Sequence, residues 1–211
     1  MSPTVYCIHT PRLILRAWSP ADAPALMSAK NASKEHLLPW MPWAQPEPTD
    51  LEANLALIRA WRAQFDTDKD YVYGIFDRGN SAVLGGTGLH ERIGMNAREI
   101  GYWVRVEAIN RGIATETAAA LTKVGFEIIG LDRMEIHCDV RNLRSAAIPR
   151  KLGFTHDANL RRRSITVGAL ADSMIWTMFA DEYPHSPAAR VEVEAFDILG
   201  QKLAATPRQE S

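Results

Sequence analysis

The chain has 211 residues, of which 46% are hydrophobic and 23% are charged, which is the balance of a globular domain and not of a disordered or fibrous protein. A formal net charge of -1 excludes the strong overall basicity that attracts many proteins to nucleic acids or anionic membranes. Cys7 and Cys138 lie far apart without CxxC spacing, so we expect reduced thiols and no zinc site. Without a signal-peptide pattern or an apolar run of ~18 residues, the sequence favours a soluble, cytoplasmic protein.

The first part of the chain predicts a strand, a helix and an irregular loop. Residues 12–16 (RLILR) form the strand, and Ser19-Pro20 supplies an N-cap and a first-turn proline for a helix that reaches Ala29. Residues 36–48 (HLLPWMPWAQPEP) contain four prolines and two tryptophans. Proline interrupts regular helices, so we expect an ordered loop anchored by its aromatic side chains.

The middle of the chain predicts a helix followed by an antiparallel meander. Thr49 with Glu52 three positions later forms a capping-box pattern, and apolar residues at helical spacing follow it. Three β-rich segments come next, with a turn at residues 77–80 between the first two. These predicted strands cover residues 71–76, 83–89 and 99–106.

The second half alternates helices with strands and then changes in composition. A helix opens near Gly112 and ends at Ile129, where Gly130 stands in C-cap position. The later predicted elements are a strand at 133–140, a helix at 145–152, and strands at 163–167 and 174–179. We therefore divide the chain into a domain at 1–185 and an extension at 186–211, in which VEVEAFDIL alternates as an additional strand would.

Residues 109–121 (INRGIATETAAAL) place arginine, glycine and small side chains where a strand gives way to a helix. The first amides of a helix have no partner within the helix, and the helix dipole adds partial positive charge there. Gly112 would let an anion approach the backbone, and Thr115 would add a hydroxyl donor. The same pattern also fits an ordinary helix start. GxxxxGK[ST] is absent and GxGxxG fails, so any phosphate site here belongs to another class.

Several motifs in register resemble the GCN5-related N-acetyltransferase (GNAT) superfamily, and more narrowly its RimJ/RimL-like branch. They cover roughly residues 10 to 182 and are RLILR at 12–16, WMPW at 40–43, GGTGLH at 85–90, IGYWV at 100–104, RGIATE at 111–116, NLRS at 142–145, KLGF at 151–154, and Gly168 with Asp172. This resemblance implies an α/β (α+β) GNAT fold, in which a mixed, mostly antiparallel sheet flanked by helices is splayed at a bulge in the fourth strand.

The resemblance also implies acetyl-CoA as co-substrate and no metal. The pantetheine arm would pair with the backbone of Val104 and Val106 and would bond to Asn142. The pyrophosphate would lie on the amides of Arg111, Gly112, Ile113, Ala114 and Thr115. The family pattern (Gln/Arg)-x-x-Gly-x-(Gly/Ala) is not matched at Ile109, and Asn110 replaces a frequent glycine, which puts cofactor affinity and loop geometry in doubt but leaves the backbone amides.

Acetyl transfer needs a neutral amine, a polarised thioester carbonyl and a proton for the thiolate. Glu99 is the candidate base, directly or through water, although a charge at an exposed strand end is the alternative. The resemblance makes Ser145 the proton donor and the amide of Val104 the oxyanion donor. Without it, Asn142 is a helix cap and Ser145 a surface hydroxyl. We place no cysteine near the motifs, so we expect direct attack in a ternary complex.

Other features have plainer interpretations. Arg161 to Arg163 form a solvated edge and do not indicate RNA binding. His90 and His137 have no partners at metal spacing and are taken as packed or exposed histidines. Trp40 and Trp43 are either core anchors or a wall of the acceptor site.

The main hypothesis is an acetyl-CoA-dependent N-acetyltransferase acting on a protein N-terminal amine or a small primary amine. The alternatives are a non-catalytic acyl-CoA-binding module and a transferase that uses another donor such as succinyl-CoA. We expect no direct contact with nucleic acid or membrane. The alternating segment at 191–199 suggests a homodimer in which it pairs with a neighbouring sheet edge.

Overall fold

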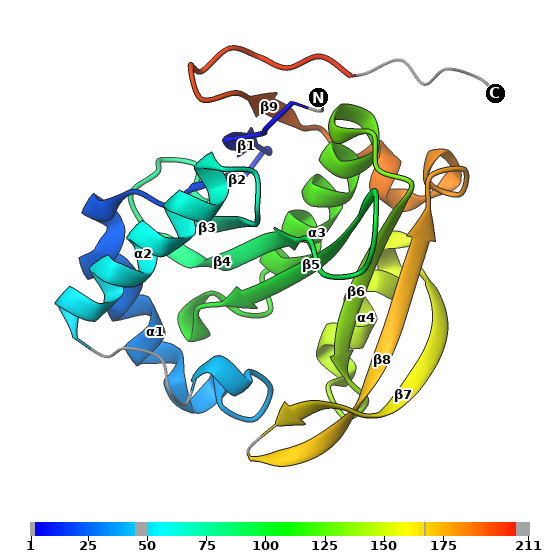
Figure 1. The fold of residues 1–211 in the computed structure, drawn as a ribbon, viewed down its shortest axis with the longest axis horizontal. Helices are drawn as coiled ribbons and strands as arrows, with labels where there is room; N and C mark the ends of the chain where they lie inside the picture. Colours follow the sequence, from blue (N-terminus) through cyan, green and yellow to red (C-terminus); the bar gives the residue numbers. More distant parts are fainter. Residues whose placement is uncertain (1–2, 45–49, 167, 206–211) are drawn as a thin grey trace.

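The computed structural model describes residues 3–44, 50–166 and 168–205 and contains a mixed sheet flanked by helices (Figure 1). The strands are β1 (Cys7–His9), β2 (Leu13–Ala17), β3 (Tyr71–Asp77), β4 (Val83–His90), β5 (Ala97–Val104), β6 (Arg133–Asp139), β7 (Thr155–Thr166), β8 (Ala169–Phe179) and β9 (Glu194–Phe196). The α-helices are α1 (Ala23–Leu37), α2 (Leu51–Asp66), α3 (Ile113–Val124) and α4 (Leu143–Leu152).

The strands form one sheet in the order β7-β8-β6-β5-β4-β3-β2-β1-β9. All neighbours are antiparallel except β5 and β6, which are parallel because the crossover helix α3 lies between them in the chain. The predicted meander is present as β3 to β5. The α+β architecture with a mixed sheet is therefore confirmed.

Alternation along the strands divides the core between the two faces of the sheet. On β3, Tyr73 and Ile75 point into the main core with α3, whereas Phe76 points into a second cluster with Trp18 and Ile58 beneath α1 and α2. The helices α1 and α2 thus cover one face, and α3 and α4 pack on the other (Figure 1).

Several predicted boundaries differ from the structure. The first helix does not stop at Ala29 but continues to Leu37, so it takes in the start of the predicted loop. The cap of α2 is Asp50, whose side chain accepts from the amide of Ala53. The proposed capping residue Thr49 and the loop residues 45–49 lie outside the described residues.

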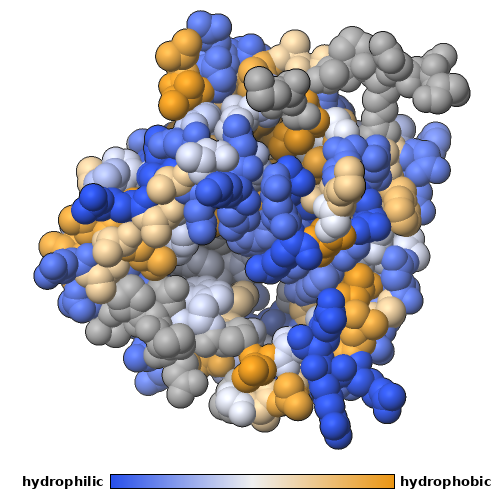
Figure 2. All heavy atoms as spheres, in the orientation of Figure 1, coloured by the Kyte–Doolittle hydropathy of each residue, from blue (hydrophilic) through white to orange (hydrophobic). Residues whose placement is uncertain are grey.

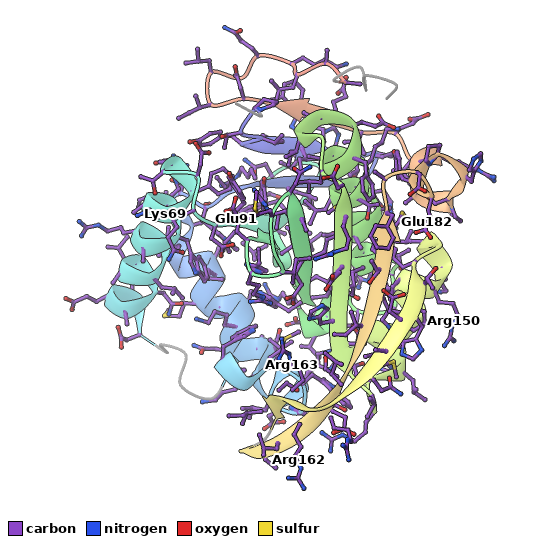
Figure 3. The ribbon with its side chains drawn as sticks, turned by 45° about the vertical axis from the view of Figure 1, so that its right-hand side comes forward. Lys69, Glu91, Arg150, Arg162, Arg163 and Glu182 are labelled. Atoms are coloured by element: carbon purple, nitrogen blue, oxygen red, sulfur yellow. The ribbon has the colours of Figure 1, made fainter. Side chains whose placement is uncertain are left out.

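The largest difference is the long arm formed by β7 and β8. We predicted strands only at 163–167 and 174–179, because the polar segment THDANLRRR lacks the alternation of a strand. β7 instead begins at Thr155 and pairs with β8 through two register shifts, the second between Leu160 and Ser164. Figure 3 shows Arg162 and Arg163 toward the end of this arm.

The segment treated as an extension joins the same sheet and core. β9 pairs with β1, and Ala188 and Ala195 are buried in the main cluster. On its other side, Phe196 bridges to Lys202 of the same chain. The alternating tail is thus used within its own chain, which removes the reason it gave for expecting a dimer. None of the helices in the described residues has the length and apolarity that crossing a bilayer requires.

Candidate active site

The pairing between β5 and β6 ends early and leaves a V-shaped opening. The two strands are neighbours from Ala97 to Glu99, and the described residues show no further ladder between them. Past this point β6 stays paired with β8, whereas β5 stays paired with β4. This is the predicted splay at the fourth strand, since β5 is the fourth of the strands that the sequence indicates.

Alternate backbone amides of β5 face this opening. The ladder between β4 and β5 shows no register shift among the described residues, so the predicted bulge is absent and the opening comes from the divergence of β6. The Arg105 amide donates to the Leu84 carbonyl of β4 at 2.7 Å. In an antiparallel ladder, successive residues bond to opposite sides. The amides on the side of the opening therefore belong to Ile100, Tyr102 and Val104.

Val106 does not continue this strand, contrary to our prediction. β5 ends at Val104, and Val106 begins a 3-10 turn, η3 (Val106–Ala108), whose last residue is buried. The Val106 amide donates to Ser33 Oγ of α1 at 3.0 Å. The alternation of Val104 and Val106 suggested a longer strand. The buried Ser33 hydroxyl instead accepts the hydrogen bond of the Val106 amide, which is the donor that an added strand would need.

The amino terminus of α3 presents backbone amides without a side-chain cap. Its N-cap is Gly112 with φ of 76°, a left-handed conformation that glycine adopts without strain. The first bond within the helix joins the Glu116 amide to the Gly112 carbonyl at 3.0 Å. The amides that precede it belong to Ile113, Ala114 and Thr115, and Arg111 is exposed beside them. This geometry fits the predicted anion site.

A partly buried polar contact fixes the loop before α3 to the start of the chain. Glu116 accepts from Thr10 Oγ1 at 2.6 Å and from Arg12 Nε at 2.6 Å. Arg12 Nη1 also donates to the Arg111 carbonyl at 2.9 Å. The loop thus keeps its shape although Ile109 and Asn110 depart from the family pattern, and Asn110 takes up the required positive φ of 62°.

The predicted proton donor lies on α4, on the other side of the opening. Asn142 caps α4 by accepting from the Ser145 amide at 3.1 Å, so its role as a helix cap is real. Ser145 Oγ lies 3.1 Å from the hydroxyl of Tyr102 on β5. Burial raises the pKa of Tyr102, so this phenol stays protonated at neutral pH. Sequence reasoning missed Tyr102 because it looked for a tyrosine only farther along the chain.

Cys138 corrects a second expectation. We expected no cysteine near the motifs, but Cys138 stands four positions before Asn142, and β6 brings it into the cavity wall with Ser145. Burial raises the pKa of Cys138 to about 11, with a smaller opposite effect from Ser145. A thiol with this pKa is a poor nucleophile at neutral pH, so direct attack by the amine remains the simpler chemistry.

A cavity of about 740 Å³ lies between α1, the ends of β4 to β6 and the β7–β8 arm. Figure 2 shows the molecule hollowed on this side. Its aromatic wall includes Trp40, Trp43 and Trp103, with the rings of Trp43 and Trp103 at 6.1 Å in an edge-on contact. Arg163 also lines the cavity while remaining exposed, so the arginine run is not only a solvated edge.

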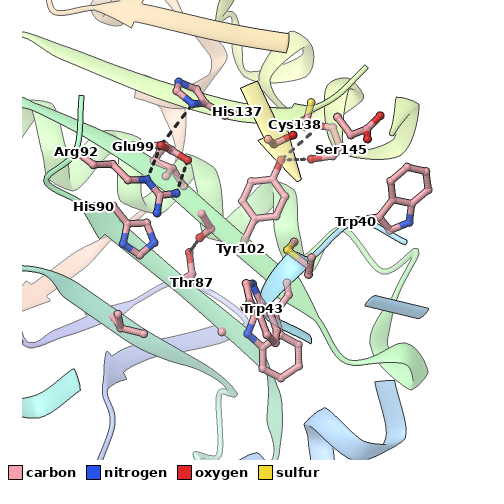
Figure 4. A pocket seen from close by; sticks show the side chains of 18 of the residues that line it. Trp40, Trp43, Thr87, His90, Arg92, Glu99, Tyr102, His137, Cys138 and Ser145 are labelled. Carbon is pink, nitrogen blue, oxygen red and sulfur yellow. Dashed lines mark hydrogen bonds and ion pairs between the residues drawn. The ribbon is translucent and has the colours of Figure 1, made fainter. Parts of the chain in front are cut away.

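Glu99 lies in the cavity wall and is 7% exposed, not the free strand-end charge that was the alternative. Arg92 bonds both of its oxygens, at 2.7 and 2.6 Å, and His137 Nδ1 lies 3.5 Å away (Figure 4). Burial raises the pKa of Glu99, but the hydrogen bonds of Arg92 and the charges of His137 and Arg92 together hold it below its ordinary value. Sequence spacing gave no signal for Arg92.

Both histidines that we took as packed or exposed line the same cavity. His137 Nε2 lies 2.6 Å from Glu135 on β6. His90 lies at the end of β4, with Nδ1 about 3 Å from both oxygens of Asp70. Within the described ranges, no group of three or more histidine, cysteine, aspartate or glutamate side chains is arranged to hold a metal ion.

Comparisons with known proteins agree with this geometry. The family model described as an acetyltransferase (GNAT) domain matches residues 12–155. YdaF of Bacillus subtilis, provisionally named a ribosomal N-acetyltransferase, is 25% identical over 178 residues, which cover 84% of this chain and 96% of that protein.

Two solved structures share the fold. RimJ of Mycobacterium smegmatis in complex with CoA-disulfide is 25% identical with a TM-score of 0.78, covering 90% of this chain and 95% of that one. RimL, a ribosomal L7/L12 alpha-N-protein acetyltransferase, in complex with coenzyme A as a disulfide with one of its cysteines, is 22% identical with a TM-score of 0.75, covering 82% and 97%. Since the family model spans most of the chain, including β5, α3, β6 and α4, the chain belongs to the GNAT family of acetyltransferases.

Proposed function

We propose that this enzyme transfers the acetyl group of acetyl-CoA to the α-amine of a protein N-terminus, by direct attack in a ternary complex. The observation that carries the proposal is the convergence of three features on one opening: the uncapped start of α3, the alternate amides of β5, and the Ser145–Tyr102 pair. The names of RimL and YdaF, which refer to ribosomal N-acetylation, support a protein acceptor.

The residues present fit acetyl-CoA. A Cβ at Gly112 would stand 3.4 Å from Arg12 Nη2 and would be strained at its positive φ, so glycine keeps this approach to the backbone open. The diphosphate would be held by the backbone from Arg111 to Thr115 and the pantetheine arm by the edge of β5 at Val104. The side-chain amide nitrogen of Asn142 would bond to the arm, because its oxygen already caps α4.

Bound acetyl-CoA supplies a thioester carbonyl, at which a C–N bond to the amine forms while the C–S bond breaks. The Val104 amide faces the opening and would stabilise negative charge on the carbonyl oxygen. Ser145 would give its proton to the departing sulfur and would be oriented by the protonated Tyr102.

The proton of the acceptor amine requires a different group. An α-amine has a reference pKa near ~8, compared with ~10.4 for lysine, so an N-terminus needs only a weak base. Glu99 faces the cavity, but Arg92 donates to both of its carboxylate oxygens, and the pKa of Glu99 is lowered. We therefore assign Glu99 to positioning the amine and Arg92, with proton removal directly or through water only as a secondary route.

The test measures thiol release from acetyl-CoA with peptides that begin with serine or alanine, with polyamines, with aminoglycosides and with free amino acids. We expect release with the peptides and a dependence on a free N-terminus, checked with N-formylated versions. Thiol release with the small amines alone would mean that the acceptor is a small amine and not a protein N-terminus.

Two other outcomes correspond to the remaining alternatives. Binding of acetyl-CoA without turnover of any amine would favour a non-catalytic acyl-CoA module, and turnover with succinyl-CoA alone would change the donor. If Glu99→Gln combined with Ser145→Ala left kcat unchanged, the roles of both residues would be wrong even with the acceptor correct.

A further inference from the structure

We infer that His90, oriented by Asp70, takes the proton from the acceptor amine. This inference rests on the proposed N-acetyltransferase activity and names the base at the same site. It replaces Glu99 in that role and uses a histidine that the sequence gave no reason to select.

The contact with Asp70 determines which nitrogen of His90 is available. Asp70 immediately precedes β3, and its two oxygens lie 3.0 and 2.9 Å from His90 Nδ1. A carboxylate at this distance favours a hydrogen on Nδ1, which leaves the lone pair on Nε2. Among the described residues we find no hydrogen-bond partner for Nε2. The side chain of His90 is 20% exposed and lines the cavity, so Nε2 can meet a substrate.

Two glycines show where this nitrogen lies. A Cβ added at Gly88 would stand 2.7 Å from His90 Nε2, and one added at Gly101 would stand 3.1 Å from it. The imidazole ring of His90 therefore packs over the backbone of Gly88 and Gly101, where any side chain would collide with it. Gly101 lies on β5 between Ile100 and Tyr102, whose amides face the opening, so Nε2 is beside the point where the sheet splays.

The surrounding charges favour His90 over its neighbours. Arg92 holds both oxygens of Glu99, and His137 is directed at carboxylates through both nitrogens, with Glu135 at 2.6 Å and Glu99 at 3.5 Å. His90 has one carboxylate partner and one free nitrogen. Compared with Glu99 and His137, His90 is therefore better arranged to accept a proton from the substrate.

The reaction balances with this assignment. A proton moves from the ammonium nitrogen of the acceptor to His90 Nε2, directly or through one water. The freed lone pair forms the C–N bond, the C–S electron pair leaves with sulfur, and sulfur takes the proton of Ser145. The nitrogen of the new amide loses its second proton, which replaces the proton of Ser145 directly or through water. His90 then returns its proton to solvent, so the enzyme is unchanged after each cycle.

The experiment compares His90→Ala and His90→Asn with the wild type on the best peptide. We expect kcat to fall about 100-fold in both, within the range for loss of a general base, while the Kd for acetyl-CoA stays within twofold. The asparagine variant keeps a donor toward Asp70 and guards against a folding defect. Adding imidazole should restore at least tenfold in His90→Ala and nothing in His90→Asn, which a purely structural role would not produce.

A matched control is His185→Ala, which removes an exposed histidine in the segment after β8. This variant should keep the wild-type kcat and show no response to imidazole. The inference is overturned if His90→Ala keeps kcat within threefold, if imidazole restores no activity, or if the loss and the rescue occur in His137→Ala instead. A wild-type protein that acetylates no amine would overturn the proposed function itself, so the two failures are distinguishable.

Discussion

On the α3 side of the opening the groups that would hold acetyl-CoA are backbone amides, whereas on the α1 side the cavity is lined by tryptophans and charged side chains. Backbone amides are present whatever side chain is attached, so Ile109 and Asn110, which depart from the family pattern, leave the amides of the first side in place. The second side has no such tolerance, because every contact depends on a particular side chain. Binding of the acyl donor would thus depend on local backbone conformation, whereas binding of the acceptor would depend on side chains brought together by tertiary packing.

The largest effect is expected where the two sides meet. Ser145→Ala removes the proposed proton donor for the thiolate and should lower kcat about 100-fold. Tyr102→Phe, which removes only the hydroxyl that contacts Ser145, should lower kcat about tenfold. The Kd for acetyl-CoA should change less than twofold in both, as measured by calorimetry. Equal small effects on kcat would mean that the sulfur leaves without this pair.

On the donor side, Gly112→Ala places a Cβ at a positive φ, which costs about 1 kcal/mol or more. We expect an increase of about tenfold in the KM for acetyl-CoA, and no change in the KM for the acceptor. Gly130→Ala is the matched control, since Gly130 has a φ of 79° at the other end of the same helical segment with open space around it. If Gly130→Ala lowers Tm by a similar amount but leaves the KM for acetyl-CoA unchanged, the effect of Gly112→Ala on that KM comes from the anion site and not from lost stability.

On the acceptor side, Trp43→Ala removes the ring packed on Trp103 and should raise the acceptor KM about fivefold, from the ~1 kcal/mol that such ring contacts contribute. The KM for acetyl-CoA should remain as in the wild type. A change in the donor KM alone would show that the tryptophan wall serves the cofactor, and the division into two sides would fail.

The smallest effect is expected at Cys138. Cys138→Ala should keep kcat within twofold, because the amine attacks directly in the proposed mechanism. With its pKa raised to about 11, the thiol is mostly protonated at pH 7 to 8, and alkylation by iodoacetamide should rise about tenfold for each pH unit up to that value. Mass spectrometry follows the labelling, with Cys138→Ala as the blank. Rapid labelling at pH 7 would reopen an acyl-enzyme route.

The donor side could be predicted from sequence because its determinants are local. The start of α3 at Gly112 and the capping of α4 by Asn142 depend on residues within four positions of one another, where capping rules and glycine conformations apply. The antiparallel meander of β3 to β5 also followed from local patterns. The length of β5 did not, since its end depends on a contact of Val106 with Ser33, 73 positions away.

The acceptor side could not be predicted in the same way. Asp70 and His90 are 20 positions apart, and Tyr102 and Ser145 are 43 apart, so neither pair has a spacing that a motif would record. Cys138 lies only four positions before Asn142, but the sequence alone did not show that it lines the same cavity as Ser145. Side chains that meet only across a sheet need the three-dimensional structure to be found.

The contact of Arg12 with the α3 loop has a consequence for how the protein is made. Arg12 leaves the ribosome 104 residues before Glu116, the carboxylate that holds it. During synthesis the proposed donor site therefore stays incomplete until β2 to β5 have been made and α3 has packed against the residues around Arg12. Retention of the emerging chain on immobilised coenzyme A would then mark the moment at which its two halves close on each other.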